Sequence, residues 1–372
     1  MKKIAILTFH TAYNYGAVLQ AYSLQEFISY QKGFEGNILD YRSEILEQRN
    51  KASANLKKGN PVKNIIMYLL RCKDIKKRNE LFDNFRKKYF KIEREALLKS
   101  DLSSTNDIYD AFIVGSDQVW NKDIIKDDNS FFFDFVNDDS KKYSYAASIG
   151  KTSFSESEEN ELIENIKPFN CISVRENDVV DDLSEKLNRE IYSSLDPVFL
   201  YGSDNWRKFS TYNKRKPYIL YFMMGMGSQG IPALEFAKKL AREKNLDIVF
   251  LSDNERWYKF RDTTHFGVAS PNEFVGLIDH ADLVVTNSFH ATAFSIILHT
   301  PFFTETAVLR SNRITSLLDI VGLSDCGLHK GQPIKDPDEI IRSVNWENVD
   351  ANANRKIKES KEYLQSILLD LK

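Results

Sequence analysis

The stretch that decides the fold is ADLVVTNSFHATAFSIILHTPFF, residues 281–303. Residues 283–285 form a short apolar, β-branched run, which is typical of a strand buried on both faces. Polar residues with good helix-capping chemistry end this run, and residues 291–298 are then apolar nearly all round, which predicts a buried helix. Pro301 ends that helix. The stretch therefore predicts a strand, a polar corner, a helix and a further strand, as in a parallel α/β sheet.

The corner carries Asn287, Ser288 and His290, which a simple buried connection does not need. In an open parallel sheet, ligands bind outside the carboxyl ends of the strands, where a helix start offers free N–H groups and the positive end of its dipole. The corner therefore predicts an anion site with His290 as a proton donor. A plainer interpretation is a capping cluster with a histidine in the core.

Length and composition narrow the class of protein. A chain of 372 residues is long for one domain, so two are expected. A net charge of −2 predicts no nucleic-acid partner, and three cysteines without metal or disulfide spacing fit a reducing cytoplasm. The start, MKKIAILTF, is interpreted as a first strand rather than a signal peptide because its apolar run is short. No apolar run approaches the roughly 20 residues of a membrane span.

The first half repeats the pattern of strand, polar loop and helix. Strands are expected at 3–9, 38–41, within 110–121, at 142–148 and at 171–175, with a helix at 17–29. The candidate side chains at the ends of these strands are His10, Asn14, Tyr15, Gly16, Ser116, Asp117 and Arg175. Gly16 suits either close backbone approach to a ligand or a simple turn. Arg175 suits either an anion fork or a surface ion pair with Glu176 or Asp178.

The second half restarts the alternation after turn signals near residues 196–204. We therefore predict an N-terminal domain at 1–200, a C-terminal domain at 201–345 and a terminal helix at 346–372. A strand at 217–224 leads into Gly225, Gly227 and Gly230, a GxGxxG pattern that precedes a predicted helix at 231–244. This context fits a dinucleotide fingerprint, but it also fits a loop that lines a cleft between two domains.

Residues 49–94 differ in charge, with 15 Lys and Arg against 4 Asp and Glu. Apolar residues recur at helical spacing over 62–70 and again over 75–89, which predicts a basic insert of two amphipathic helices. The ordinary interpretation is a solvated polar face. The functional alternative is an anionic membrane surface or a phosphate-bearing substrate as its partner.

Four stretches together resemble one family. TFHTAYNYGAVLQAYSLQ, YDAFIVGSDQVWN, ISVRE, and the corner with NRITSLLDIVGL occur in this order over roughly residues 1–323. They resemble the polysaccharide pyruvyl transferases of bacterial capsule, exopolysaccharide and cell-wall synthesis. The corner reads SFHAT where the family pattern has SFHGT, so Ala291 lacks the conformational freedom of glycine. The basic segment and the glycine-rich loop are not part of the resemblance.

The resemblance implies an α/β fold of two Rossmann-like domains that face a cleft, as in GT-B glycosyltransferases. It also implies transfer of pyruvate from phosphoenolpyruvate to two hydroxyls of one sugar, which forms a cyclic ketal and releases phosphate. The N-terminal domain would take the acceptor and the C-terminal domain the donor. This chemistry requires no metal and no redox cofactor, since phosphoenolpyruvate is a co-substrate.

Roles for the candidate residues follow from that chemistry. His290 would act as general acid or phosphate ligand, with His10 as a second proton-transfer candidate. Arg313 and Arg175 would hold the phosphate or carboxylate, beside donors from Asn287 and Ser288. Five residues would face the acceptor sugar, with the aspartate as candidate base: Asn14, Tyr15, Gly16, Ser116 and Asp117.

The expected location is the cytoplasm, with peripheral contact at the inner membrane face where acceptors linked to polyprenyl diphosphate are assembled. The main alternative function is a GT-B glycosyltransferase that uses a nucleotide sugar. A saccharide-binding protein without catalysis and a dehydrogenase are further alternatives.

Overall fold

The computed structural model describes residues 1–52, 61–150, 154–212, 216–224, 231–252, 264–265, 268–306, 312–329 and 336–371. The side chains of residues 49–71 and the glycine-rich loop at 225–230 lie outside the described residues. The predictions made for that loop therefore stay predictions.

The first half of the chain builds a parallel sheet in the order β2-β1-β3-β4. Its strands are β1 (Lys2–Leu7), β2 (Phe34–Ile38), β3 (Ala111–Val114) and β4 (Lys142–Ser144). Two short parallel strands, β5 (Ser173–Val174) and β6 (Tyr192–Ser193), lie beside β4 and the residues that follow it, as the isolated bridges from Tyr143 to Cys171 and from Ala147 to Val174 show. All four residues of β3 are fully buried, as expected for a strand covered on both faces.

The second half builds a six-stranded sheet in the order β12-β11-β10-β7-β8-β9, in which every pair is parallel. Its strands are β7 (Tyr218–Met223), β8 (Asp247–Ser252), β9 (Thr264–His265), β10 (Leu283–Thr286), β11 (Phe302–Thr306) and β12 (Gly327–His329). The strand order runs outward in both directions from the β10–β7 pair. The β10–β7 pair is therefore a topological switch point, where the connections leave a crevice at the carboxyl ends of the strands.

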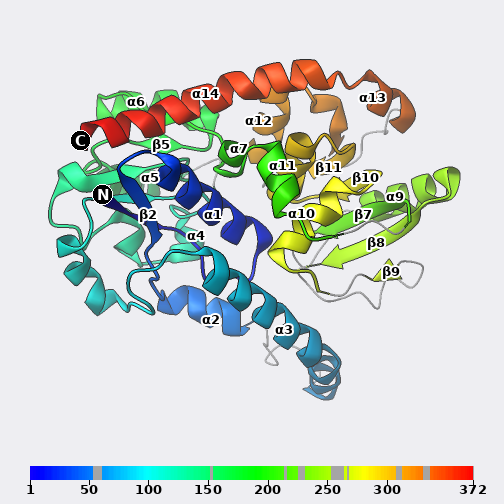
Figure 1. Cartoon of the computed structure of the whole chain (residues 1–372), viewed down its shortest axis with the longest axis horizontal. Coiled ribbons are helices and arrows are strands. Elements are labelled where there is room, and N and C mark those ends of the chain that lie inside the picture. The colour runs from blue at the N-terminus through cyan, green and yellow to red at the C-terminus, as the bar shows by residue number, and fades with distance from the viewer. Residues whose placement is uncertain are drawn as a thin grey trace.

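The first sheet has the same kind of switch point between β1 and β3. In Figure 1 the two sheets lie side by side, with helices around them. The helices of the first half are α1 (Tyr15–Tyr30), α2 (Glu44–Ala52), α3 (Pro61–Tyr89), α4 (Lys122–Ile125), α5 (Glu156–Ile166), α6 (Val180–Leu187), α7 (Val198–Tyr201) and α8 (Ser203–Phe209). Those of the second half are α9 (Ile231–Lys244), α10 (Pro271–Asp279), α11 (Phe289–Leu298), α12 (Asn312–Val321), α13 (Pro337–Ser343) and α14 (Trp346–Asp370).

The two halves share one hydrophobic cluster. The ring of Tyr15, in the first turn of α1, stacks on Phe274 of α10 with their centroids 4.3 Å apart. The Tyr15 hydroxyl also donates a hydrogen bond to the carbonyl of Ala269 at 3.0 Å. Tyr15 thus fixes the start of α1 against the second half of the chain.

Helices α3 and α14 stand out in Figure 1, where α3 extends away from the body and α14 runs along both halves. The last helix packs on α12 in the second half and on α7 in the first. The Tyr363 hydroxyl donates to the carbonyl of Ser144 at 2.8 Å, so α14 reaches the edge of the first sheet. Within the described residues, no helix is long and apolar enough to cross a membrane.

Most predicted elements occur as expected, but two predictions were wrong. The strand expected at 38–41 lies instead at Phe34–Ile38, where the chain pairs with residues 2–6 of β1. In place of the two helices expected over 62–70 and 75–89, the chain forms one continuous helix, Pro61–Tyr89. No glycine or proline occurs after Pro61 in this helix, so nothing in its sequence forces a break.

Candidate active site

The two switch points face one pocket of about 250 Å³. It is lined by Asn14, Asp117, Gln118, Met224, Asn287, Ser288, Phe289, His290, Glu305, Arg313 and Ile314. The first half contributes residues that follow β1 and β3, and the second half contributes residues that follow β7, β10 and β11. The carboxyl-end rule thus brings six predicted residues together, namely Asn14, Asp117, Asn287, Ser288, His290 and Arg313.

Three helices begin at the pocket. Asn14 caps α1 by accepting a hydrogen bond from the backbone N–H of Ala17 at 3.1 Å, and Ser288 caps α11 through the N–H of Ala291 at 3.4 Å. Helix α12 starts at Asn312, one residue before Arg313. The capping interpretation therefore holds for the side chain of Ser288. Because the positive dipole ends of the three helices converge, the pocket still favours an anion.

Asn287 lines the pocket and joins two strand ends there. Its Oδ1 accepts a hydrogen bond from the backbone N–H of Met224 at 2.6 Å, and its Nδ2 donates to the carbonyl of the same residue at 3.3 Å. The side chain thus ties the end of β10 to the end of β7 across the switch point. One N–H of the amide remains for a ligand.

Arg313 brings a positive charge to the pocket wall. Burial and the positive charge of nearby Arg175 lower the pKa of Arg313 to about 10, although Glu176, Asp117 and Asp196 act in the opposite direction. The guanidinium is therefore charged at neutral pH. Among the residues that the structure describes, no carboxylate lies within ion-pair distance of it. An anion in the pocket would give this guanidinium an ion-pair partner.

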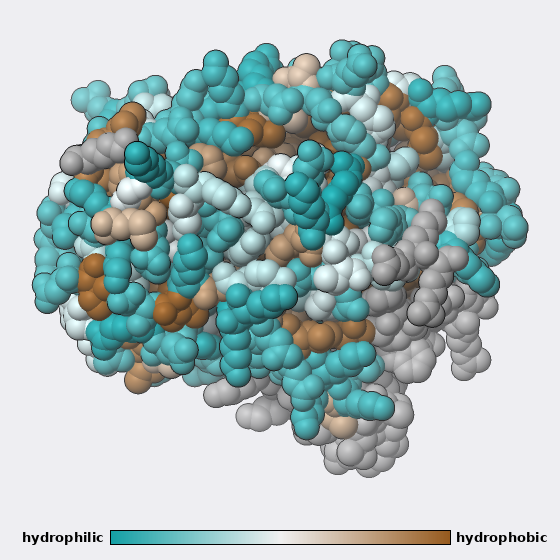
Figure 2. Space-filling model, viewed as in Figure 1, coloured by the Kyte–Doolittle hydropathy of each residue, from teal (hydrophilic) through white to brown (hydrophobic). Residues whose placement is uncertain are grey.

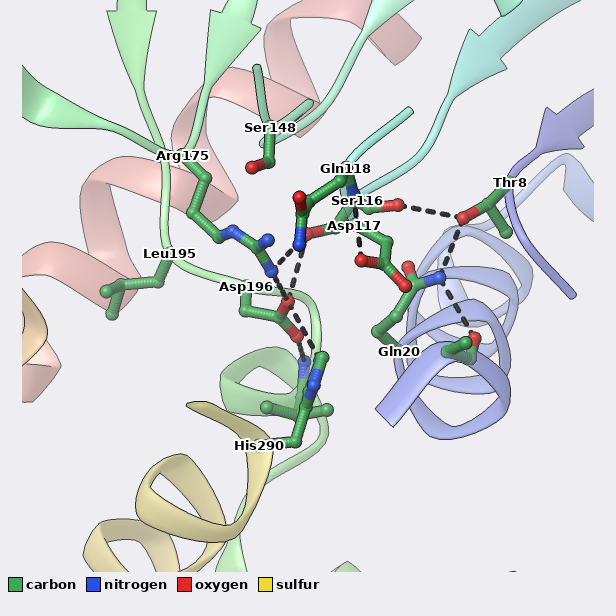
Figure 3. A network of polar contacts seen from close by, with 12 residues as sticks. Thr8, Gln20, Ser116, Asp117, Gln118, Ser148, Arg175, Leu195, Asp196 and His290 are labelled. Carbon is green, nitrogen blue, oxygen red and sulfur yellow. Dashed lines mark hydrogen bonds and ion pairs between the residues drawn. The ribbon is translucent and has the colours of Figure 1, made fainter. Parts of the chain in front are cut away.

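Asp196 is the centre of a buried polar network behind the pocket. Figure 3 shows its carboxylate between the guanidinium of Arg175 and the ring of His290. Oδ2 accepts a hydrogen bond from Arg175 Nη1 at 2.8 Å and one from Ser116 Oγ at 2.9 Å, and it lies 3.3 Å from His290 Nε2. Oδ1 accepts from the backbone N–H of Val198 at 3.1 Å.

The carboxylate of Asp196 is fully buried and ionised. Burial alone would raise the pKa of Asp196, but His290 and Arg175 hold that pKa well below its usual range. A carboxylate beside a histidine orients its ring, and a histidine is the commonest general acid in active sites. This pair can therefore supply a proton to a ligand in the pocket.

Arg175 is buried and pairs with Asp196, not with Glu176 or Asp178. Its guanidinium lies over the ring of Phe289, 4.7 Å from the ring centroid, and Phe289 lines the pocket. Nε and Nη2 are buried and, within the described part of the chain, have no hydrogen-bond partner. These two N–H groups form the edge of a guanidinium that can bind two oxygens of one anion.

Asp117 follows β3 with a φ of +79°, a left-handed conformation that is unusual for a residue other than glycine. Such strained residues occur at functional sites. One carboxylate oxygen accepts a hydrogen bond from the backbone N–H of Gln118 at 2.8 Å. This strained conformation places Asp117 in the wall of the pocket that the first half of the chain contributes.

Five predicted residues are not among those that line this pocket, namely His10, Tyr15, Gly16, Ser116 and Arg175. His10 is buried, and its ring lies 2.9 Å from Asp40 and 3.0 Å from the carbonyl of Thr8. Tyr15 packs between the two halves, and Ser116 donates to Asp196. Gly16 lies against the ring of His290. The acceptor contacts and the proton transfer assigned to these residues therefore remain predictions.

The sequence prediction missed Gln118, Phe289 and Glu305, which line the pocket, and Asp196, which lies behind it. Asp196 follows β6, so the rule that identified the other candidates applies to it as well. Its neighbour Pro197 led us to interpret the pair as a turn between domains. Phe289 lies between two predicted residues, but an aromatic side chain gave no chemical signal of its own.

The fold has solved relatives. UDP-N-acetylglucosamine 2-epimerase from Neisseria meningitidis, solved with UDP-N-acetylglucosamine bound, matches with a TM-score of 0.54 and 11% identity over 100% of each chain. The same enzyme from Rickettsia bellii matches with a TM-score of 0.54 and 12% identity over 100% of this chain and 96% of that one. At such identities the likeness establishes the fold alone. It confirms the predicted arrangement of two Rossmann-like domains, which is GT-B-like.

Comparison with curated proteins finds no match. The family model described as polysaccharide pyruvyl transferase matches residues 14–304, well over half of the chain. The match begins at the cap of α1 and ends within β11, so it includes the β10–β7 switch point and, of the first switch point, β3. The chain therefore belongs to the polysaccharide pyruvyl transferase family.

Proposed function

We propose that this protein transfers the pyruvyl group of phosphoenolpyruvate to two hydroxyls of one sugar in a bacterial surface polysaccharide or its precursor. The observation that carries the proposal is the pocket where three helix starts and Arg313 meet the His290–Asp196 pair. The helix starts and the arginine favour an anionic donor. The histidine and its carboxylate favour proton transfer to that donor.

The proposed reaction has three steps. A proton adds to the methylene carbon of phosphoenolpyruvate, and the adjacent carbon becomes an oxocarbenium-like electrophile. A sugar hydroxyl attacks this carbon and loses its proton. A second hydroxyl then attacks the same carbon, the bond from this carbon to the phosphate oxygen breaks, and the hydroxyl proton leaves with the phosphate. The net products are the cyclic ketal and inorganic phosphate. The reaction needs no redox cofactor, and we propose that it also proceeds without a metal.

The pocket suggests a role for each group. His290 donates the proton, and Asp196 orients its ring. Arg313 and the unpartnered edge of Arg175 hold the donor's phosphate and carboxylate. Asp117, on the opposite wall, accepts the proton of the attacking hydroxyl.

Replacing Arg313 by alanine should weaken phosphoenolpyruvate binding about 10- to 100-fold, as expected for a charged hydrogen bond worth about 1.5–3 kcal/mol. The measurement is a thermal-shift titration of wild type and R313A. A ligand at about 100 times its Kd stabilises a protein by about 2.7 kcal/mol, so the wild-type shift is easily measured. R342A is the matched control, because Arg342 is an exposed arginine on α13. Equal shifts for wild type and R313A would contradict the assignment.

The same titration tests the alternative function. A GT-B glycosyltransferase would be stabilised by a UDP-sugar and not by phosphoenolpyruvate. That result would replace pyruvyl transfer by glycosyl transfer as the proposed reaction. Release of inorganic phosphate from phosphoenolpyruvate in the presence of acceptor sugars would support the pyruvyl transferase.

We further propose that α3 contacts an anionic membrane surface on the cytoplasmic side, where the lipid-linked acceptor is presented. The described part of α3 exposes Lys73, Lys76, Lys77, Lys87 and Lys88. In Figure 2 the visible face is mainly hydrophilic, with apolar residues in small groups. The contact would therefore be electrostatic, at about 1 kcal/mol per basic residue near the surface.

Flotation with vesicles that contain phosphatidylserine should therefore recover the protein at low salt and not at high salt. Replacing Lys76 and Lys77 by glutamate should lower the bound fraction at least tenfold. The control replaces Arg355 and Lys358, exposed basic residues on α14, in the same way. No flotation of the wild type at low salt would remove this proposal.

A further inference from the structure

Gly16 and His290 come from different halves of the chain and lie in contact. Gly16 is in the first turn of α1, and His290 is in the first turn of α11. A Cβ atom on residue 16 would overlap Nδ1, Cγ and Cε1 of His290. Its distance to each of these atoms would be well below 3.0 Å, which is shorter than the contacts that real Cβ atoms make. Only glycine fits at residue 16 while the ring of His290 stays in place.

The overlap shows how the ring is oriented. The Cβ would lie at nearly the same distance from Nδ1 and from the two carbons bonded to it. An approach in the ring plane would leave those two carbons much farther away than Nδ1. The backbone of Gly16 therefore covers the flat face of the imidazole rather than an edge of the ring.

The two nitrogens of the His290 ring have different surroundings. Nε2 is buried and lies 3.3 Å from Asp196 Oδ2. Nδ1 is therefore the nitrogen that a ligand in the pocket can reach. Because Tyr15 stacks on Phe274, the first turn of α1 cannot shift away from the ring without breaking the contact between the halves.

We propose that Gly16 is a positioning residue for His290. Its backbone, which carries no side chain, packs against the face of the imidazole, a contact that we call the seat. The seat keeps Nε2 beside Asp196 and leaves Nδ1 to exchange the proton with the donor. The catalytic part of this inference rests on the proposed pyruvyl transfer. The seat itself is a property of the folded chain, and it can be tested without any substrate.

The test is a double-mutant cycle on thermal stability. In the wild-type background, G16A should lower the Tm by several degrees because the added methyl group displaces the ring. In the H290A background, the same substitution should leave the Tm unchanged or raise it, since the overlap is gone and alanine is the better helix former. If G16A is too unstable to purify, recovery of folded protein by the G16A/H290A double variant supports the seat equally well.

G276A is the matched control for this cycle. Gly276 is also a glycine within a helix, and a Cβ there would overlap Ser210 and Tyr212 rather than His290. G276A should lower the Tm by the same amount in both backgrounds. A loss of Tm for G16A that persists in the H290A background would overturn the seat.

Activity tests the catalytic part. G16A should lower kcat at least 100-fold, towards the value for H290A, while the KM for phosphoenolpyruvate changes less than threefold. A wild-type kcat for G16A would overturn the positioning role. If the wild type itself does not turn over phosphoenolpyruvate, the proposed function fails, and the Tm cycle still decides the seat.

Discussion

Replacing His290 by alanine is expected to lower pyruvyl transfer by about 10²- to 10⁴-fold, the range that a positioned general acid contributes. The protein should still fold, because Nε2 of His290 has no hydrogen-bond partner within the described residues and Asp196 keeps its ion pair with Arg175. Phosphoenolpyruvate should still bind, since Arg175 and Arg313 remain. The measurement is release of inorganic phosphate with a sugar acceptor, beside a thermal-shift titration of the donor.

The control for H290A lies at the other end of the same helix. His299 caps the carboxyl end of α11, and its ring pairs with Asp350 at 2.8 Å. H299A should therefore keep wild-type kcat. An H290A enzyme with wild-type turnover would show that the proton comes from another group, and His10 would be the next candidate to test.

Replacing Asp196 by alanine is expected to cost about 3–5 kcal/mol of unfolding free energy, because it leaves the buried charge of Arg175 without its partner. The substitution also removes the acceptor for Ser116 and Val198. D196N should cost less, since its amide oxygen can still accept one of these bonds. The measurement is urea unfolding, and D338N is the control, because Asp338 pairs with Lys244 on the surface.

The pH dependence of stability should follow the same carboxylate. The folded-state pKa of Asp196 lies below its value in the unfolded chain, which is about 3.9. Its contribution to stability is therefore complete above about pH 4 and is lost as the pH falls towards the folded pKa. The stability advantage of the wild type over D196N should shrink on acidification through this range. A constant difference between the two proteins from pH 7 to pH 2 would contradict an ionised Asp196.

The pocket walls could be predicted from the sequence because they follow a local rule. Apolar runs followed by polar residues indicate the carboxyl ends of strands, and the ends of β1, β3, β7 and β10 meet at the pocket. Asn14, Asp117, Asn287 and His290 each follow such a run. Arg313 was assigned from the donor chemistry that the family resemblance implies, which requires a cation beside the phosphate or carboxylate.

The network behind the pocket could not be predicted in the same way. Asp196, Arg175 and His290 are joined by contacts between distant parts of the chain, and no spacing in the sequence encodes these contacts. The contact between Gly16 and His290 crosses from one half to the other. The sequence indicated that Gly16 allows a close approach, but only the packing of α1 shows that the approaching group is a side chain of the protein.

The last helix has a consequence for how the active site is held. The backbone N–H of Leu195, one residue before Asp196, donates a hydrogen bond to Ser360 Oγ of α14 at 3.0 Å. At its other end α14 is anchored in the second half, where Trp346 stacks on His299 with their centroids 4.8 Å apart. The helix is thus a strut between the two halves, and it bears directly on the loop that carries the central carboxylate. The residues of this strut lie beyond the family match, which ends at residue 304, so the support of Leu195 comes from a part of the chain that the family pattern does not include.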